Sequence, residues 1–252
     1  MDEREKRLEQ VKRWKYFNPL LYEYNVLDHT KKLVWLLEEL LPIIEKTHSS
    51  IDKKKTILLA KIHDDIEIVI DDITAAEKEQ MTKEEKNQLE ENEKKAVERL
   101  VKKYQGTMEG YSYRDLLKEA LEKKTKEAKI MNMVDKFDSF GEALHEIHAG
   151  NKKFSKNINN SLPDPVNFYK EISRKKIKAM KGIEKLLQIN HPILKEPETI
   201  EVKKIIEQGK KHSRESLKEE TTNEFYNHWK RVIIERGGEE GIQILLKKFN
   251  NE

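Results

Sequence analysis

Apolar residues recur along this chain at the three- and four-residue spacing that places them on one face of a helix. The clearest run predicts a buried helix face and comprises Leu33, Leu36, Leu37, Leu40 and Leu41. Pro42 is expected to end or kink this helix, because proline lacks a backbone N–H and crowds the preceding turn. A second helix is predicted from about residue 56, although the β-branched residues of 66–70 leave a strand open.

The same spacing predicts helices along most of the remaining chain. The first covers residues 2–16 and is followed by Pro19, which closes it. The others cover 77–104, 114–149 and 166–189. Of these, 114–149 is predicted as two helices, and a loop at 160–165 precedes 166–189. From about residue 198 the pattern returns, and Gly237 and Gly238 break it before a last short helix. Because nine glycines and six prolines are few for the turns of a β-sandwich or barrel, the predicted fold class is all-α.

The length of 252 residues suits one large domain with an appendage. Since no internal repeat and no long linker divide the chain, we expect a helical core over 1–190 and a C-terminal helical extension over 191–252.

The charges are dense but balanced, with 50 Lys and Arg against 47 Asp and Glu, for a net charge of +3. No segment gathers basic residues among aromatics, so no nucleic acid polymer is expected as a partner. No stretch reaches the roughly 18 apolar residues of a membrane span, which favours a cytoplasmic protein without a membrane partner. With no cysteine present, any metal would be held by His, Asp and Glu.

The densest chemistry lies at His63 and Asp64. Five carboxylates fall within nine residues, namely Asp64, Asp65, Glu67, Asp71 and Asp72. Such groups repel one another unless a cation neutralises them, although a solvated acidic helix face is the simpler alternative. His29, four residues before Leu33, and Asp135, on an apolar helix, add ligand types that a divalent metal accepts.

The ordered segments NVLDHT, KIHDDIEIVIDDI and NMVDKFDSFGEALHEIHAGN resemble the HD-domain metallophosphohydrolases, most closely their 5′-deoxynucleotidase-like branch, over about residues 5–190. The resemblance implies an HD-domain helical bundle. It also implies a divalent ion (Mn, Co, Fe, Mg or Zn) held by His29, His63, Asp64 and Asp135, with Glu67 and Asp72 as catalytic residues. On an unbroken helix Asp72 would face away from His63, so this role requires the helix to end or bend first.

The chain departs from the branch at Tyr22, where an Arg that helps to hold the substrate phosphate is usual. Arg13 and Trp14 resemble an Arg-Trp pair of the branch, in which the Trp bears on sugar recognition. Three lysines next to the site are candidate phosphate ligands, but solvated surface lysines are the simpler interpretation: Lys32, Lys61 and Lys136.

Other polar clusters have structural interpretations. Glu142, His145 and His148 read as an outward-facing polar stripe, and Trp229 with Phe225 and Tyr226 as the core contact of the extension, a homodimer interface being the alternative. Four histidines lack a partner at ligand spacing and are given no role: His48, His191, His212 and His228.

The function that this pattern favours is a metal-dependent phosphohydrolase that releases phosphate from (deoxy)nucleoside 5′-monophosphates. One alternative is hydrolysis of another phosphate ester or of a signalling nucleotide such as (p)ppGpp, although alarmone hydrolases carry Glu-Asp where this chain has Glu67-Ile68. The other is an HD-fold interaction protein without turnover. Base and sugar preference, metal identity, oligomeric state and the role of residues 191–252 stay open.

Overall fold

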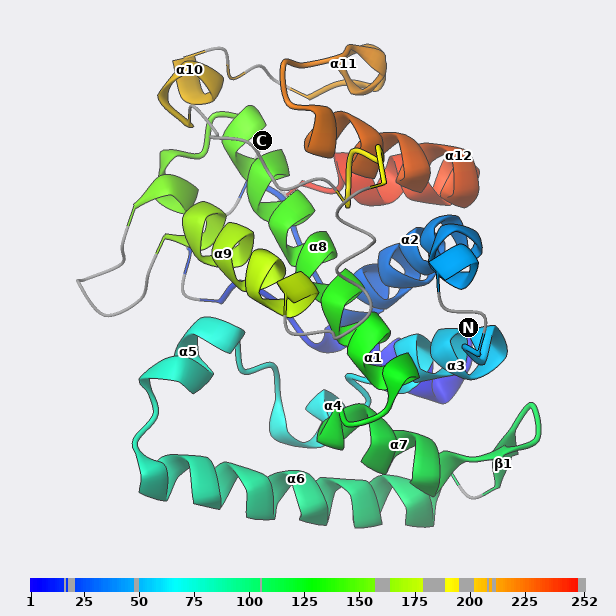
Figure 1. Ribbon diagram of the computed structural model, residues 1–252. Coiled ribbons are helices and arrows are strands. Elements are labelled where there is room, and N and C mark those ends of the chain that lie inside the picture. Colours follow the sequence, from blue (N-terminus) through cyan, green and yellow to red (C-terminus); the bar gives the residue numbers. More distant parts are fainter. Residues whose placement is uncertain are drawn as a thin grey trace.

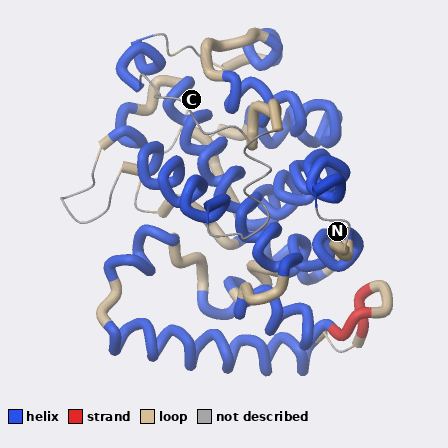
Figure 2. The backbone as a smooth tube through the Cα atoms, in the orientation of Figure 1, coloured by secondary structure: helices blue, strands red, loops and turns tan. Residues whose placement is uncertain are grey.

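The computed structural model describes residues 1–15, 17, 21–47, 50–104, 106–156, 164–178, 189–194, 202–207, 209 and 212–248. Within these residues the chain is a helical bundle with one two-stranded hairpin, as Figure 2 shows, so the all-α prediction is confirmed.

The bounds of the elements follow in chain order. The first half contains α1 (Glu3–Gln10), α2 (Val26–Thr47), α3 (Lys53–Ile62), α4 (Glu67–Ile70), α5 (Ala75–Gln80), α6 (Lys83–Lys103), β1 (Thr107–Met108) and β2 (Tyr111–Ser112). The second half contains α7 (Tyr113–Glu122), α8 (Lys126–His148), the 3-10 helix η1 (Lys152–Ser155), α9 (Pro165–Lys178), α10 (Val202–Glu207), α11 (Arg214–Lys218) and α12 (Glu224–Leu246).

Helix α8 is the centre of the molecule, and nearly all of its residues are buried. In Figure 1 it runs through the bundle, and helices α2, α3, α9 and α12 pack against it. Its start is defined locally. Lys123 ends α7 in the left-handed conformation (φ 52°, ψ 33°), and the Thr125 side chain then accepts the Ala128 N–H as an N-cap. This short break turns the chain and confirms the prediction of two helices over 114–149.

Helix α2 continues through Pro42 to Thr47, so of the two predicted outcomes, an end or a kink, the end is wrong. Leu40, Leu41 and Ile44, on both sides of the proline, are buried in the core. Tertiary packing of an apolar face supplies most helix stability in proteins, and here it outweighs the local cost of proline.

The other predicted elements differ mainly at their ends. The first helix stops at Gln10, and the predicted helix 77–104 is divided into α5 and α6, each with its own threonine capping box. Residues 67–70 are helical and Ile66 lies in the preceding turn, so this stretch is not extended. Parts of the predicted loop 160–165 and helix 166–189 lie outside the described residues, as does His48.

The C-terminal helix α12 packs on α2 and α8. Its course changes at Gly238 (φ 55°, ψ −131°), which confirms the predicted break at the glycine pair. In the described part of the chain, no helix combines the length and hydropathy that crossing a bilayer would take.

Candidate metal centre

A tight turn between α3 and α4 presents the His63-Asp64 pair. Helix α3 ends at Ile62, and residues 63–66 form the turn before α4. The next residue, Asp65, is buried and anchors the turn, because its carboxylate accepts hydrogen bonds from Arg4 and the Tyr113 hydroxyl at 2.7 Å each. The anchored Asp65 fixes the direction in which its neighbour Asp64 leaves the backbone.

Two imidazoles from different helices face this turn with the same nitrogen. His29 Nδ1–H donates to Asp138 Oδ2 at 2.7 Å, and His63 Nδ1–H donates to the Ala60 carbonyl at 2.8 Å. A neutral imidazole that donates from Nδ1 keeps a lone pair on Nε2. Both Nε2 atoms are buried and make no hydrogen bond. The two rings therefore present unused lone pairs to the same space.

Carboxylate oxygens lie beside these lone pairs. His63 Nε2 is 3.0 Å from Asp64 Oδ2, and His29 Nε2 is 3.7 Å from the same oxygen and 3.3 Å from Asp135 Oδ1. Ligand atoms of His29, His63 and Asp64 all lie within 4.8 Å of one another. The structure thus brings together all four residues predicted as ligands, and the donor set fits a divalent cation.

The charges around the four predicted ligands also favour binding of a cation. Burial and the charge of Arg13 oppose protonation of His29, but the carboxylates of Asp135 and Asp138 outweigh them and raise its pKa to about 9. Burial opposes ionisation of Asp135, yet the charge of Lys136, 2.6 Å away, and the contact with His29 hold its pKa well below the usual range. The ionised carboxylates therefore favour a positive charge at His29, which is a proton while no ion is bound and which a divalent cation would replace.

Asp72 reaches the same cavity because the chain turns just before it. Helix α4 ends at Ile70, and Asp71 adopts φ 69°, a backbone conformation that is uncommon for a residue with a side chain. Lys15 holds this turn through an ion pair to Asp71 at 2.5 Å. The bend that sequence geometry required for Asp72 is therefore present.

Glu67 and Asp72 line the cavity with shifted pKa values. Burial, followed by the charges of Asp64 and Asp72, raises the pKa of Glu67 well above its usual value. Burial and the Asp64 charge, against the opposing charge of Arg13, raise the pKa of Asp72 to about 6. Groups with such pKa values in a cavity are suited to proton transfer near neutral pH.

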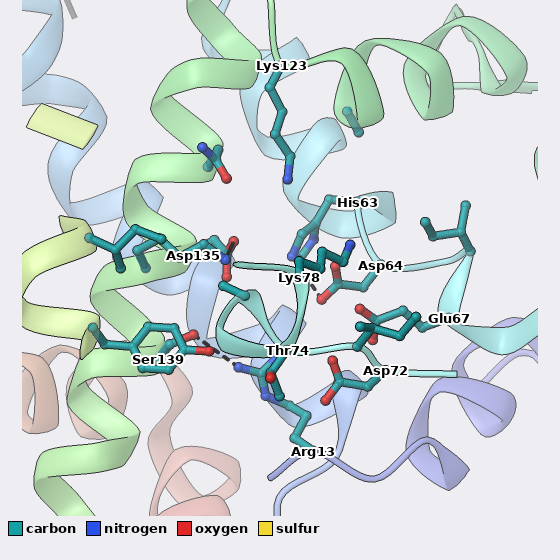
Figure 3. A pocket seen from close by; sticks show the side chains of 18 of the residues that line it. Arg13, His63, Asp64, Glu67, Asp72, Thr74, Lys78, Lys123, Asp135 and Ser139 are labelled. Carbon is teal, nitrogen blue, oxygen red and sulfur yellow. Dashed lines mark hydrogen bonds and ion pairs between the residues drawn. The ribbon is translucent and has the colours of Figure 1, made fainter. Parts of the chain in front are cut away.

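A cavity of about 200 Å³ lies between the α3–α4 turn, α5, α8 and α9. Figure 3 shows Lys78 and Lys123 extending toward the acidic group. Five cations line it, namely Arg13, Lys78, Lys123, Lys136 and Lys176. Loss of solvation, followed by the charge of Lys136, lowers the pKa of Lys123 to about 8. Cations at this density favour an anionic occupant.

Arg13 and Trp14 are held rigidly on the cavity wall. Glu142 Oε2 accepts from the Trp14 indole at 2.8 Å and from Arg13 at 3.2 Å, and Arg13 also donates to Ser139. Trp14 has φ 58°, which is unusual for a bulky residue. Tyr22, in contrast, is buried away from the cavity against His145, and its backbone N–H donates to Glu146. Arg13 is therefore the arginine that lines the cavity. Tyr22, which stands where the family branch usually has an arginine, does not line it.

A buried ionic network lies behind His29, and it was not predicted from the sequence. Lys32 Nζ lies 3.0 Å from Asp138 and 2.6 Å from Glu142, and all three side chains are buried. The interpretation of Lys32 as a solvated lysine is therefore wrong. Lys136 also lines the cavity, whereas Lys61 lies on the surface and pairs with Glu109 at 3.7 Å. The sequence carried one signal for this network. Asp138 follows Asp135 by three residues, so the two carboxylates lie on the same face of one helix.

The interpretation of Glu142, His145 and His148 as an outward-facing stripe is also wrong, because all three are buried. The C-terminal residues cover this side of α8. His145 contacts the Tyr226 hydroxyl and the Leu245 carbonyl, each at 2.9 Å, and His148 stacks on the Tyr226 ring. Trp229 is fully buried against α8, so its assignment as a core contact is confirmed.

A second group of imidazoles and a carboxylate lies apart from the cavity, where Glu39, His191 and His228 place ligand atoms within 4.8 Å of one another. Sequence spacing gave these histidines no partner. His228 reaches Glu39 because α12 packs on α2, which carries Glu39, while His191 comes from the turn at 189–194.

Comparisons with known proteins give a family and a similar fold. The family model described as 5′-deoxynucleotidase YfbR-like matches residues 5–173. Among curated proteins no relative matches the chain. A solved structure of a conserved hypothetical protein from Pyrococcus furiosus has a similar fold, with a TM-score of 0.53 and 20% identity, covering 73% of this chain and 94% of that chain.

Proposed function

Because the chain belongs to the YfbR-like 5′-deoxynucleotidase family, we propose that it is a metal-dependent phosphohydrolase that releases phosphate from (deoxy)nucleoside 5′-monophosphates. The observation that carries the proposal is the pair of buried, unpartnered Nε2 atoms of His29 and His63 beside the carboxylates of Asp64 and Asp135. Buried polar atoms without a partner are costly unless a ligand completes them.

In this proposal His29, His63, Asp64 and Asp135 hold one divalent ion. Such an ion supplies a Lewis acid that polarises a phosphate oxygen and makes water more acidic. The identity of the ion is not fixed by the donor set, because imidazole and carboxylate ligands accept Mn²⁺, Co²⁺, Fe²⁺, Mg²⁺ and Zn²⁺.

Glu67 and Asp72 move the protons. Water attacks phosphorus and passes a proton to Asp72, whose pKa near 6 leaves it largely ionised at neutral pH. The bond from phosphorus to the nucleoside oxygen breaks, and Glu67, kept protonated by its raised pKa, donates a proton to that oxygen. Each group then returns to its starting state by exchange with solvent.

The cations on the cavity wall bind the substrate phosphate. Arg13 is held against Glu142 at a fixed angle, and Lys123 and Lys176 make no ion pair within the described residues. An arginine fork and free ammonium groups are the usual phosphate ligands of proteins. Trp14, beside Arg13, supplies an aromatic face for the sugar end of the substrate.

The domain organisation fits the same proposal. We assign the hydrolase core to residues 1–190, which include every cavity-lining residue, and treat 191–252 as a helical extension packed on that core.

The direct test is phosphate release by the purified protein with added Mn²⁺ or Co²⁺. The panel contains deoxyribonucleoside and ribonucleoside 5′-monophosphates, a sugar phosphate and (p)ppGpp. We expect release from the 5′-monophosphates. Hydrolysis of (p)ppGpp alone would move the protein to the signalling-nucleotide alternative, and no turnover of any compound would leave an interaction protein.

Glu67→Gln separates proton transfer from metal binding. We expect the variant to keep its metal content and to lose roughly 10²- to 10⁴-fold in kcat, the usual scale for a lost acid or base. Metal analysis and single-turnover phosphate release measure the two effects. Loss of metal in this variant would contradict the assigned role.

A further inference from the structure

Helix α12 begins fifty-one residues after the end of the family match at residue 173, yet it carries a residue that contacts Asp138, the partner of the predicted ligand His29. Trp229 is fully buried, and its indole lies in a notch on α8. The notch exists because residue 141 is glycine: a Cβ there would lie 2.3 Å from the indole ring. The ring therefore has one defined place against α8.

The indole N–H completes the hydrogen bonding of Asp138. Trp229 Nε1–H donates to Oδ1 at 2.8 Å, while Oδ2 accepts from His29 Nδ1–H at 2.7 Å and lies 3.0 Å from Lys32 Nζ. Asp138 is fully buried, so no water competes for these oxygens. Because the indole offers a single donor and no acceptor, it binds one carboxylate oxygen and leaves the other facing His29.

The orientation of Asp138 decides which nitrogen of His29 faces the cavity. With Nδ1–H held by Oδ2, the lone pair of Nε2 points to Asp135 Oδ1 at 3.3 Å and Asp64 Oδ2 at 3.7 Å. We propose that Trp229 is a positioning residue of the metal centre, acting through Asp138 on His29, and that the C-terminal extension is thereby part of the site. This inference rests on the metal site of the proposed function.

A purely structural role for Trp229 makes a different prediction, and the chain offers a matched control. Tyr226, about one turn earlier on α12, is equally buried, and its hydroxyl donates one hydrogen bond to His145 Nδ1 on α8 at 2.9 Å. Trp229→Phe and Tyr226→Phe each keep a ring and remove one polar contact between the same two helices. Only the contact of Trp229 leads to His29.

The experiment measures the Kd of Mn²⁺ or Co²⁺ for the full chain by calorimetry, beside the thermal midpoint of each variant. We expect Trp229→Phe to weaken metal binding about tenfold or more, the scale of a lost outer partner of a metal-ligating histidine. Tyr226→Phe should keep its Kd within about twofold of the wild-type value, although its thermal midpoint should also fall because a buried hydrogen bond is lost. Equal weakening in both variants, or none in Trp229→Phe, would overturn the inference.

A second readout keeps the test independent of the proposed function. The Nδ1–H proton of His29, protected by Asp138, should give an observable NMR signal in the wild type and in Tyr226→Phe, and should be lost to exchange in Trp229→Phe. If the wild type binds no divalent ion, the hydrolase proposal fails. The NMR signal then still decides the positioning role, and its persistence in Trp229→Phe would refute it.

Discussion

The group formed by His29, His63 and Asp64 and the group formed by Glu39, His191 and His228 both hold imidazoles and a carboxylate within ligand distance. The two groups differ in the role of Nδ1, the ring nitrogen that faces away from the shared ligand position. In the first group each Nδ1–H donates to an oxygen. In the second, His191 Nδ1 accepts the Ile193 N–H at 3.3 Å, and His228 Nδ1 accepts from Arg231 at 2.9 Å.

The acceptor role of Nδ1 in the second group has a chemical consequence. A neutral imidazole that accepts at Nδ1 carries its proton on Nε2, so these rings face Glu39 with N–H groups. Arg236 also binds the Glu39 carboxylate at 2.6 Å and neutralises it. Proximity of ligand types is therefore not sufficient, and the outer hydrogen-bond partner of each ring decides whether a metal can be held.

The largest effect is expected from a substitution that removes a ligand beside the first group. Asp135→Ala removes a carboxylate from the ligand set, and we expect metal content to fall to background and turnover to fall by on the order of 10³-fold or more. Elemental analysis and phosphate release measure both. Glu39→Ala, which removes the carboxylate of the second group, is the control and should keep metal and rate. Full activity of Asp135→Ala would contradict the assignment.

Asp138→Asn changes the outer partner and leaves the ligands in place. An amide offers one acceptor oxygen, so either His29 or Trp229 loses its acceptor. We expect metal affinity to weaken roughly 10- to 100-fold, with helix content unchanged by circular dichroism. An unaltered Kd would mean that the Nδ1 partner does not distinguish the two groups.

The two groups should also differ in their response to pH. A base acts when ionised, so kcat/KM should rise with pH through about 6, the pKa of Asp72, and level off above it. The rise between pH 5 and 7 should be about tenfold, and Asp72→Asn should remove it. Burial lowers the pKa of His228 to about 4, so the second group should add no step in this range.

The smallest effect is expected from His228→Gln. Because this ring faces Glu39 with its N–H, we expect metal content and kcat/KM to stay within about twofold of the wild type, as for most substitutions away from the site. A fall in the number of ions bound per chain would show that the second group holds a metal and would remove the distinction drawn above.

The sequence was sufficient to predict four residues that lie close together beside the cavity. His29, His63, Asp64 and Asp135 stand in recognisable order on amphipathic helices, and these helices converge as their apolar faces require. Asp72 could be named only from the resemblance, because its position depends on the φ angle of Asp71, which spacing does not reveal.

The network behind the ligands could not be predicted in the same way. Lys32, Asp138 and Glu142 are ordinary surface residue types, and their burial follows from mutual pairing between α2 and α8. His145 and His148 were misread for a related reason, since the chain that covers them lies about 80 to 100 residues later. A single sequence does not record which distant segment covers a polar face.

The turn at Asp71 also bears on how this protein can evolve. A residue with a side chain at φ 69° and ψ 164° costs roughly 1 to 3 kcal/mol, so glycine at position 71 would relieve this backbone strain. The same change would remove the Lys15 ion pair and free the backbone that directs Asp72. Selection for thermostability and selection for turnover therefore oppose each other at this position, and a heat-adapted relative would be expected to gain its stability elsewhere.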